Sequence, residues 1–80
     1  MTMPQLPDDS KNDELKKLIA IASDLGLAMR MRVQAIDLLA EIGNHDALLA
    51  LLNLVANDRL DFSERDFAIK KARELIKKGD

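Results

Sequence analysis

The sequence predicts an all-α fold, a short α-solenoid of four helices built from roughly two 33-residue units. Three observations carry this prediction. The apolar residues are mostly leucine, isoleucine and alanine, and Phe62 and Phe67 are the only aromatic residues in the 80-residue chain, which favours helices over strands. Apolar residues also recur at helical spacing between helix start and stop signals. Finally, the chain matches itself at an offset of 33 residues.

The first two helices are each expected to end close to a glycine. The first begins near residue 12 or 13 and runs to Asp24, with Gly26 as its stop signal. Acidic residues in its first turn suit the positive end of the helix dipole. The second spans about residues 29–42 and ends at Gly43. Residues 1–11, with two prolines and an acidic patch, are expected to form a flexible tail before a domain of residues 12–80.

The third helix follows almost at once, with Asn44 as its N-cap, and runs to about Asn57. Residues 57–62 then form the turn between the units. Ser63 and Asp66 resemble a capping box that opens the fourth helix, which closes on two lysines before Gly79.

The repeat needs no gap in its alignment. From residue 13 onward, eight positions are identical at an offset of 33: Asp13 and Asp46, Leu15 and Leu48, Leu18 and Leu51, Leu27 and Leu60, Arg32 and Arg65, Ala35 and Ala68, Ile36 and Ile69, Glu41 and Glu74. Repeated helix pairs of this length are typical of α-solenoids, in which each unit buries its apolar face against its neighbours.

Residues 31–55, MRVQAIDLLAEIGNHDALLALLNLV, carry a family resemblance. Met31 and Arg32 stand where the family has Val-Arg. The other matching positions are Ala35, Leu39, Ile42, Gly43, Ala47, Leu48 and Leu51. The pattern resembles a HEAT-like repeat of the short, phycobilin-lyase type, and the resemblance covers roughly residues 13–79. It implies a right-handed α-solenoid (an α-α superhelix) that acts by binding, and it implies neither a substrate nor a chromophore.

Some positions depart from that family's pattern. Asp61 and Arg65 repeat its Asp-x-x-x-Arg step, but Ala28 lacks the matching acid one unit earlier. His45 stands where proline is frequent, and Ile76 replaces the glycine expected 33 residues after Gly43.

The widths of the apolar faces predict a closed stack. The third helix is apolar over about 220° of its circumference and the fourth over about 120°. Inner helices of a stack touch more neighbours than terminal ones, and terminal units need a polar outer face. In this interpretation one end is covered by Lys16, Lys17 and Asp24, and the other by Lys70, Arg73 and Lys77. We therefore expect a monomer or at most a weak dimer.

The segment NDRLDFSE, residues 57–64, resembles the second half of a calcium loop. If Glu64 held the twelfth position, Val55 would hold the third, which needs a side-chain oxygen. Asp58 would hold the sixth, where glycine is required. We therefore expect a connecting turn, and no metal ion.

No pattern of residues predicts catalysis. His45 is the only histidine and there is no cysteine, so a zinc site or a disulfide has no residues to form it. No serine has a base at motif spacing. We expect no enzymatic activity and no cofactor. The net charge of −2 gives no overall attraction for nucleic acid or for an anionic membrane. No apolar run is long enough to span a membrane, so a cytoplasmic protein is expected.

Two surfaces remain as candidates for binding a partner. Met29, Met31 and Phe62 lie near the starts of the second and fourth helices, where they would suit a protein partner or close the end of the core. Lys70, Arg73 and Lys77 give the fourth helix a basic face. The first interpretation is a scaffold module that binds another protein. The alternative is a nucleic-acid-binding or enzyme accessory subunit using the basic face, although no aromatic residue is interleaved there for base stacking.

Overall fold

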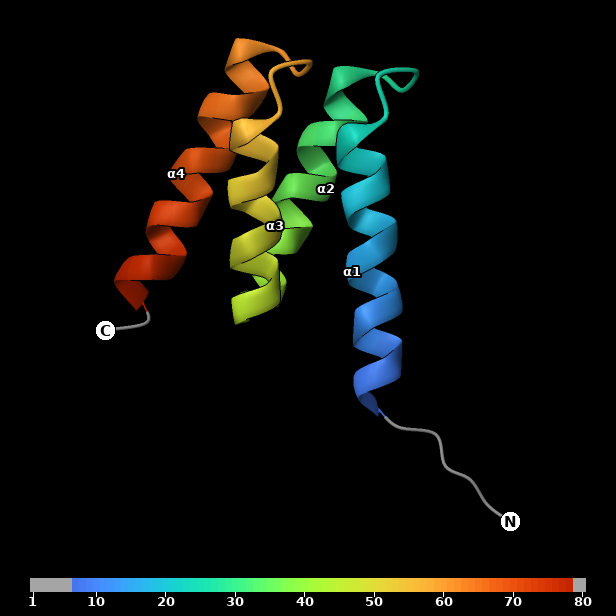
Figure 1. The fold of residues 1–80 in the computed structure, drawn as a ribbon, viewed down its shortest axis with the longest axis vertical. Helices are drawn as coiled ribbons and strands as arrows, with labels where there is room; N and C mark the ends of the chain where they lie inside the picture. Colours follow the sequence, from blue (N-terminus) through green and yellow to red (C-terminus); the bar gives the residue numbers. More distant parts are fainter. Residues whose placement is uncertain (1–6, 79–80) are drawn as a thin grey trace.

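The computed structural model describes residues 7–78, with side chains from Asp13 onward, and these residues form four α-helices. They are α1 (Pro7–Ser23), α2 (Met29–Ile42), α3 (His45–Ala56) and α4 (Phe62–Lys78) (Figure 1). Strands are absent from this part of the chain, so the all-α prediction is confirmed.

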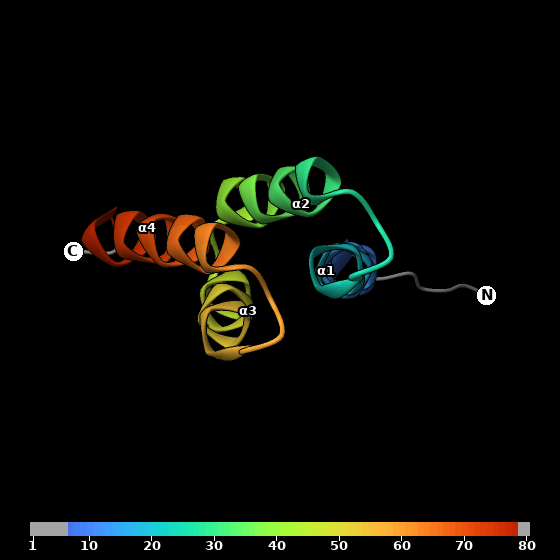
Figure 2. The ribbon, with the colours of Figure 1, turned by 90° about the horizontal axis from the view of Figure 1, so that it is seen from above.

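The helices form two antiparallel hairpins, α1 with α2 and α3 with α4 (Figure 1). Viewed from above, α2 and α4 lie in one layer and α1 and α3 in a second (Figure 2). The hairpins meet mainly where α4 packs against α2 and where α3 packs against α2 and α1. Within the described helices α1 and α4 do not touch, so they are the two outer members of the arrangement.

The core consists of leucine, isoleucine and alanine side chains from all four helices. Small alanines let helices approach closely, and the larger side chains fill the remaining space. Ile36, Leu39 and Leu51 are the largest fully buried apolar residues. Among the described side chains, the buried apolar residues are Leu15, Leu18, Ala22, Ala35, Ile36, Leu39, Ala47, Ala50, Leu51, Leu54, Leu60, Ala68 and Ala72.

The corner between α2 and α3 has the predicted caps. Gly43 ends α2 with φ of 64°, a left-handed conformation that favours glycine, and its N–H donates to the Leu39 carbonyl. Asn44 then caps α3, because its Oδ1 accepts a hydrogen bond from the Ala47 N–H at 2.8 Å. The predicted bounds of α2 and the predicted cap of α3 are confirmed.

The starts of α1 and α4 differ from the prediction. α1 begins at Pro7, earlier than residue 12, because proline is well suited to the first turn of a helix. Part of the predicted tail, residues 1–6, lies outside the described residues. α4 begins at Phe62, so Ser63 is already helical and its hydroxyl lies 3.7 Å from Met29 Sδ. The predicted capping box of Ser63 and Asp66 is wrong.

The turns that join the helices of each hairpin repeat at the 33-residue offset. Asp24 Oδ1 accepts from the Gly26 N–H at 2.8 Å, and Asn57 Oδ1 accepts from the Arg59 N–H at 3.0 Å. The carbonyl of Asp24 accepts from the Leu27 N–H, and that of Asn57 from the Leu60 N–H. The sequence repeat therefore has a matching repeat in backbone geometry.

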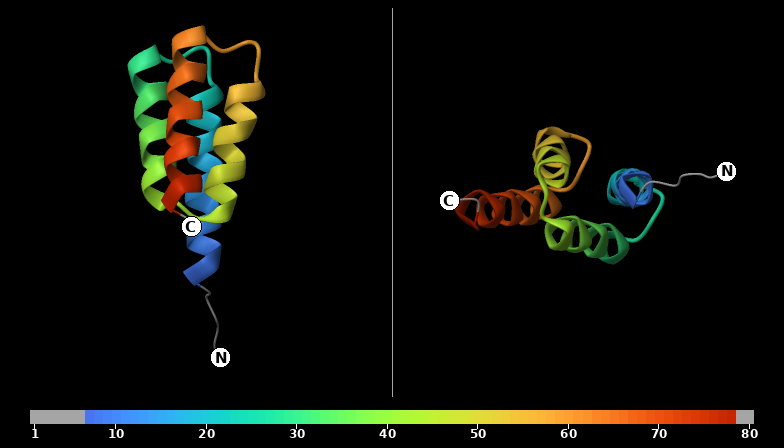
Figure 3. Two further views of the ribbon diagram at one scale, coloured as in Figure 1. Left: turned by 90° about the vertical axis from the view of Figure 1, so that its left-hand side faces the viewer. Right: turned by 90° about the horizontal axis from the view of Figure 1, so that it is seen from below.

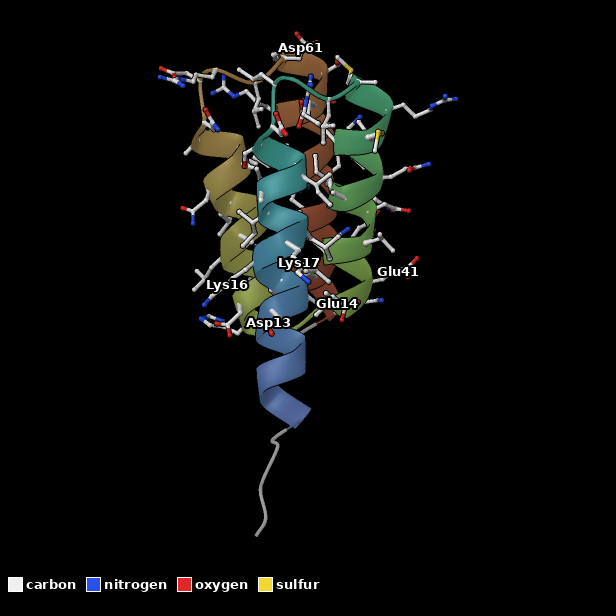
Figure 4. The ribbon with its side chains drawn as sticks, turned by 90° about the vertical axis from the view of Figure 1, so that its right-hand side faces the viewer. Asp13, Glu14, Lys16, Lys17, Glu41 and Asp61 are labelled. Atoms are coloured by element: carbon white, nitrogen blue, oxygen red, sulfur yellow. The ribbon has the colours of Figure 1, made fainter. Side chains whose placement is uncertain are left out.

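The apolar faces of the inner helices are less completely covered than a closed stack would require. Leu38 on α2 is 46% exposed, and Leu49 and Leu52 on α3 are 46% and 39% exposed. An inner helix in a two-hairpin arrangement has neighbours on only part of its circumference, so a wide apolar face extends beyond them. The outward side of α1 does carry charge, including Lys16 and Lys17 (Figure 4).

Candidate protein-binding surface

One hollow lies on the outer side of α3 and α4. Its lining residues, which we call the C-terminal surface, are Val55, Phe62, Arg65, Asp66 and Ile69. Figure 3 (left) shows α4 facing the viewer with α3 beside it. The hollow measures about 210 Å³, below the roughly 300–1,000 Å³ of small-molecule sites. A hollow of this size can accommodate one side chain from a helix of a larger partner.

Apolar and charged groups alternate on the C-terminal surface. Phe62 is 79% exposed and Ile69 is 40% exposed. Between them, half-buried Arg65 is oriented by the bond from its Nε to the Val55 carbonyl, at 2.9 Å. An exposed phenylalanine beside an oriented arginine combines two residue types that often dominate the energy of protein interfaces.

The predicted cluster of Met29, Met31 and Phe62 is divided in the structure. Met29 is half-buried against the start of α4, where its Sδ lies near the Ser63 hydroxyl. Met31 is 47% exposed and belongs to a separate hollow between α1 and α2. That hollow, the N-terminal surface, is lined by Leu18, Ile21, Met31, Gln34, Ala35 and Leu38. Phe62 alone of the three lines the C-terminal surface.

The basic face predicted on α4 is partly neutralised. Lys70 Nζ lies 3.2 Å from Asp66 Oδ2 on the same helix. Lys71 Nζ lies 3.2 Å from Asp37 Oδ1 on α2, and 5.3 Å from the centre of the Phe67 ring. Arg73 and Lys77 are exposed. These pairings reduce the positive potential that would attract a nucleic-acid backbone.

A buried ion pair joins the two hairpins. Arg32 Nε on α2 donates to Glu64 Oε1 on α4 at 2.8 Å. The arginine also donates through Nη1 to the carbonyl of Leu27, in the turn before α2. Glu64 is fully buried, and its second oxygen, Oε2, has no hydrogen-bond partner among the described side chains. Sequence analysis considered Glu64 only as the twelfth position of a calcium loop and missed this pair.

The segment that resembled a calcium loop forms the turn before α4. Asn57 uses its side-chain oxygen to accept the Arg59 N–H, and the Asp61 carbonyl accepts from the Arg65 N–H. Glu64 points into the interior towards Arg32, away from this turn. His45 is the exposed first residue of α3. Among the side chains described from Asp13 onward, histidine and acidic residues form no group of three or more that could hold a metal ion.

Comparisons with protein-family models, with curated proteins and with solved structures find no match to this chain. Over the described part of the chain, each helix is too short or too polar to cross a lipid bilayer.

Proposed function

We propose that the chain is a non-catalytic, HEAT-like α-solenoid module that binds another protein through its C-terminal surface. The observation that carries the proposal is Phe62, 79% exposed at the rim of the hollow that contains Arg65 and Ile69. A large aromatic side chain held in water gains free energy when a partner covers it, since apolar area is removed from solvent.

The repeated geometry of the turns supports the solenoid part of this proposal. Two units related by a constant offset leave one unpartnered surface at each end of the stack. The C-terminal surface belongs to the second unit in this description, and the N-terminal surface belongs to the first. Extended surfaces of this kind are what repeat proteins use for binding.

The proposal is tested by affinity capture from extracts of the native cells with nuclease present. Phe62→Ser should lose the captured protein, whereas Leu25→Ser, which removes a side chain 51% exposed in another turn, should retain it. The captured protein is then purified and its binding to both variants is measured. The proposal would be contradicted by a partner that binds the parent chain and both variants equally. It would also be contradicted if the parent chain captured the partner without nuclease but not with it.

A further inference from the structure

The interface between the two hairpins shows how α2 is contacted by the next helix of its layer, α4. On α2, the side chains that face α4 include Arg32, paired with Glu64, and Asp37, paired with Lys71. Ile36 lies between them and is fully buried. Thus two charged residues of α4, Glu64 and Lys71, contact α2. They are seven positions apart and therefore lie on the same face of the helix.

The same positions recur on the outer side of α4, where none of the four described helices covers them. Arg65 follows Arg32 by 33 residues, and Ile69 follows Ile36. Ile36 is fully buried whereas Ile69 is 40% exposed. Similarly, Met29, the first residue of α2, is half-buried against the start of α4. Phe62, 33 residues later, is exposed. The C-terminal surface is therefore the uncovered counterpart of the surface that α2 presents to α4.

The outer side of α4 carries more positive charge than the side of α2 that faces α4, and this difference bears on the chemistry of the partner. Lys70 replaces the acid found at Asp37, and Arg73 replaces Ala40. Asp66 replaces Val33 and forms an ion pair with Lys70. Among the described side chains, no carboxylate lies within ion-pair distance of Arg65. Around the C-terminal surface, the bases Arg65, Lys70 and Arg73 thus outnumber the acid Asp66, whereas Arg32 and Asp37 on α2 balance each other.

We propose that the C-terminal surface binds an acidic amphipathic helix of a partner protein, lying along α4 as α4 lies along α2. The partner helix presents one carboxylate to Arg65, as Glu64 does to Arg32. A second carboxylate, seven residues later, meets Lys70 in the place where Lys71 meets Asp37. A small apolar residue between them, corresponding to Ala68, packs on Ile69. This inference rests on the proposed function and specifies the partner's chemistry.

A second copy of the chain does not satisfy these requirements. Stacked head to tail, it would present its N-terminal surface to the C-terminal surface. Met31 would then occupy the place of Glu64, and Leu38 the place of Lys71. Neither side chain has a carboxylate, so Arg65 would lose water without gaining an anionic partner, and Lys70 would gain none beyond Asp66.

The test uses a peptide derived from α4 itself. A peptide with the 17-residue sequence of α4 carrying Lys71→Glu has acids at both required positions, and a lactam on its opposite face keeps it helical. The added glutamate would face Asp37 if the peptide displaced the native α4, which disfavours exchange. The matched control peptide carries Glu64→Gln and Lys71→Gln.

Each peptide is titrated to about 1 mM into the full isotope-labelled chain and followed by NMR. The acidic peptide should give saturable shifts at Phe62, Arg65, Ile69 and Lys70. The neutral peptide should bind at least about tenfold more weakly, because hydrogen bonds to charged groups are lost. Arg65→Gln in the chain should weaken the acidic peptide similarly, while Arg30→Gln, an equal charge change on exposed α2, should not.

A charge exchange keeps the test independent of folding defects at Arg65. Lys70→Glu in the chain recreates the acid of Asp37, so this variant should prefer the α4 peptide that retains Lys71. Equal binding of acidic and neutral peptides at the C-terminal surface would overturn the charge requirement and leave the proposed function standing. Shifts at Met31 and Leu38, concentration-dependent self-association through the C-terminal surface, or no saturable shift would each overturn the inference itself.

Discussion

Arg32 on α2 and Glu64 on α4 lie 2.8 Å apart, Nε to Oε1, and their side chains are 9% and 0% exposed. The two residues are 32 positions apart in sequence, and each belongs to a different hairpin. Bringing these charges out of water has a large cost that their attraction and added hydrogen bonds offset. The pair therefore joins the two hairpins at one point of their interface.

Removing one partner of this pair should destabilise the protein strongly. Glu64→Ala leaves the Arg32 guanidinium buried without its carboxylate, so it should lower the free energy of unfolding by about 3–5 kcal/mol. The double variant Arg32→Met/Glu64→Leu should be less destabilised than Glu64→Ala, since no unpaired charge remains. Urea denaturation measures both. A double variant less stable than Glu64→Ala would show that the ion pair itself supplies most of the stability.

Two leucines on α3 provide a matched comparison of burial. Leu51 is fully buried, whereas Leu49 on the same helix is 46% exposed. Leu51→Ala should cost about 2–5 kcal/mol through lost burial and a residual cavity. Leu49→Ala should cost less than about 1 kcal/mol, because nearly half of this leucine stays exposed to water in the folded state. Thermal and chemical denaturation of the two variants would check this, and similar losses would contradict the packing described for α3.

Gly43 should be sensitive to any residue with a Cβ atom. Its φ of 64° is a conformation that L side chains rarely adopt, and an added Cβ would lie 3.3 Å from the Ala40 carbonyl oxygen. Gly43→Ala should therefore cost about 1–2 kcal/mol. Gly43→Asn should cost less, because asparagine tolerates this conformation better. Calorimetry can rank the three proteins, and an alanine variant as stable as the parent would argue against a left-handed cap.

The Asn44 cap should contribute measurably to α3. Asn44→Ala removes the acceptor of the Ala47 N–H and should cost about 1 kcal/mol. Asn44→Asp should retain most of the stability, since its carboxylate can accept the same bond. The comparison of midpoints in urea tests this, and the expectation fails if alanine and aspartate behave alike.

The repeat and the helix boundaries could be predicted where local sequence determines structure. Gly43 and Asn44 are residue types that end and begin helices, and both do so here. The 33-residue offset placed Asp24 and Asn57 in corresponding turns, and their hydrogen bonds correspond. These features depend on interactions within a few residues.

The features that sequence analysis missed depend on contacts between distant elements. Glu64 follows a polar turn and reads as exposed, and its burial depends on Arg32 lying opposite it on α2. Likewise, Met31 and Phe62 share a position near helix starts, yet they line separate hollows on different hairpins. Helical periodicity shows which residues share a face, but it does not show which neighbouring helix covers that face.

The division of the Arg32–Glu64 pair between hairpins has a consequence for cooperativity. Each hairpin alone would expose the core residues that pack against the other hairpin and leave one charge without its partner, so we expect neither hairpin to fold on its own. Unfolding should then be a single two-state transition of the whole chain. A ligand that binds only the native state raises the free energy of every global opening. Occupation of the C-terminal surface should consequently slow hydrogen exchange in α1, although α1 and α4 do not touch.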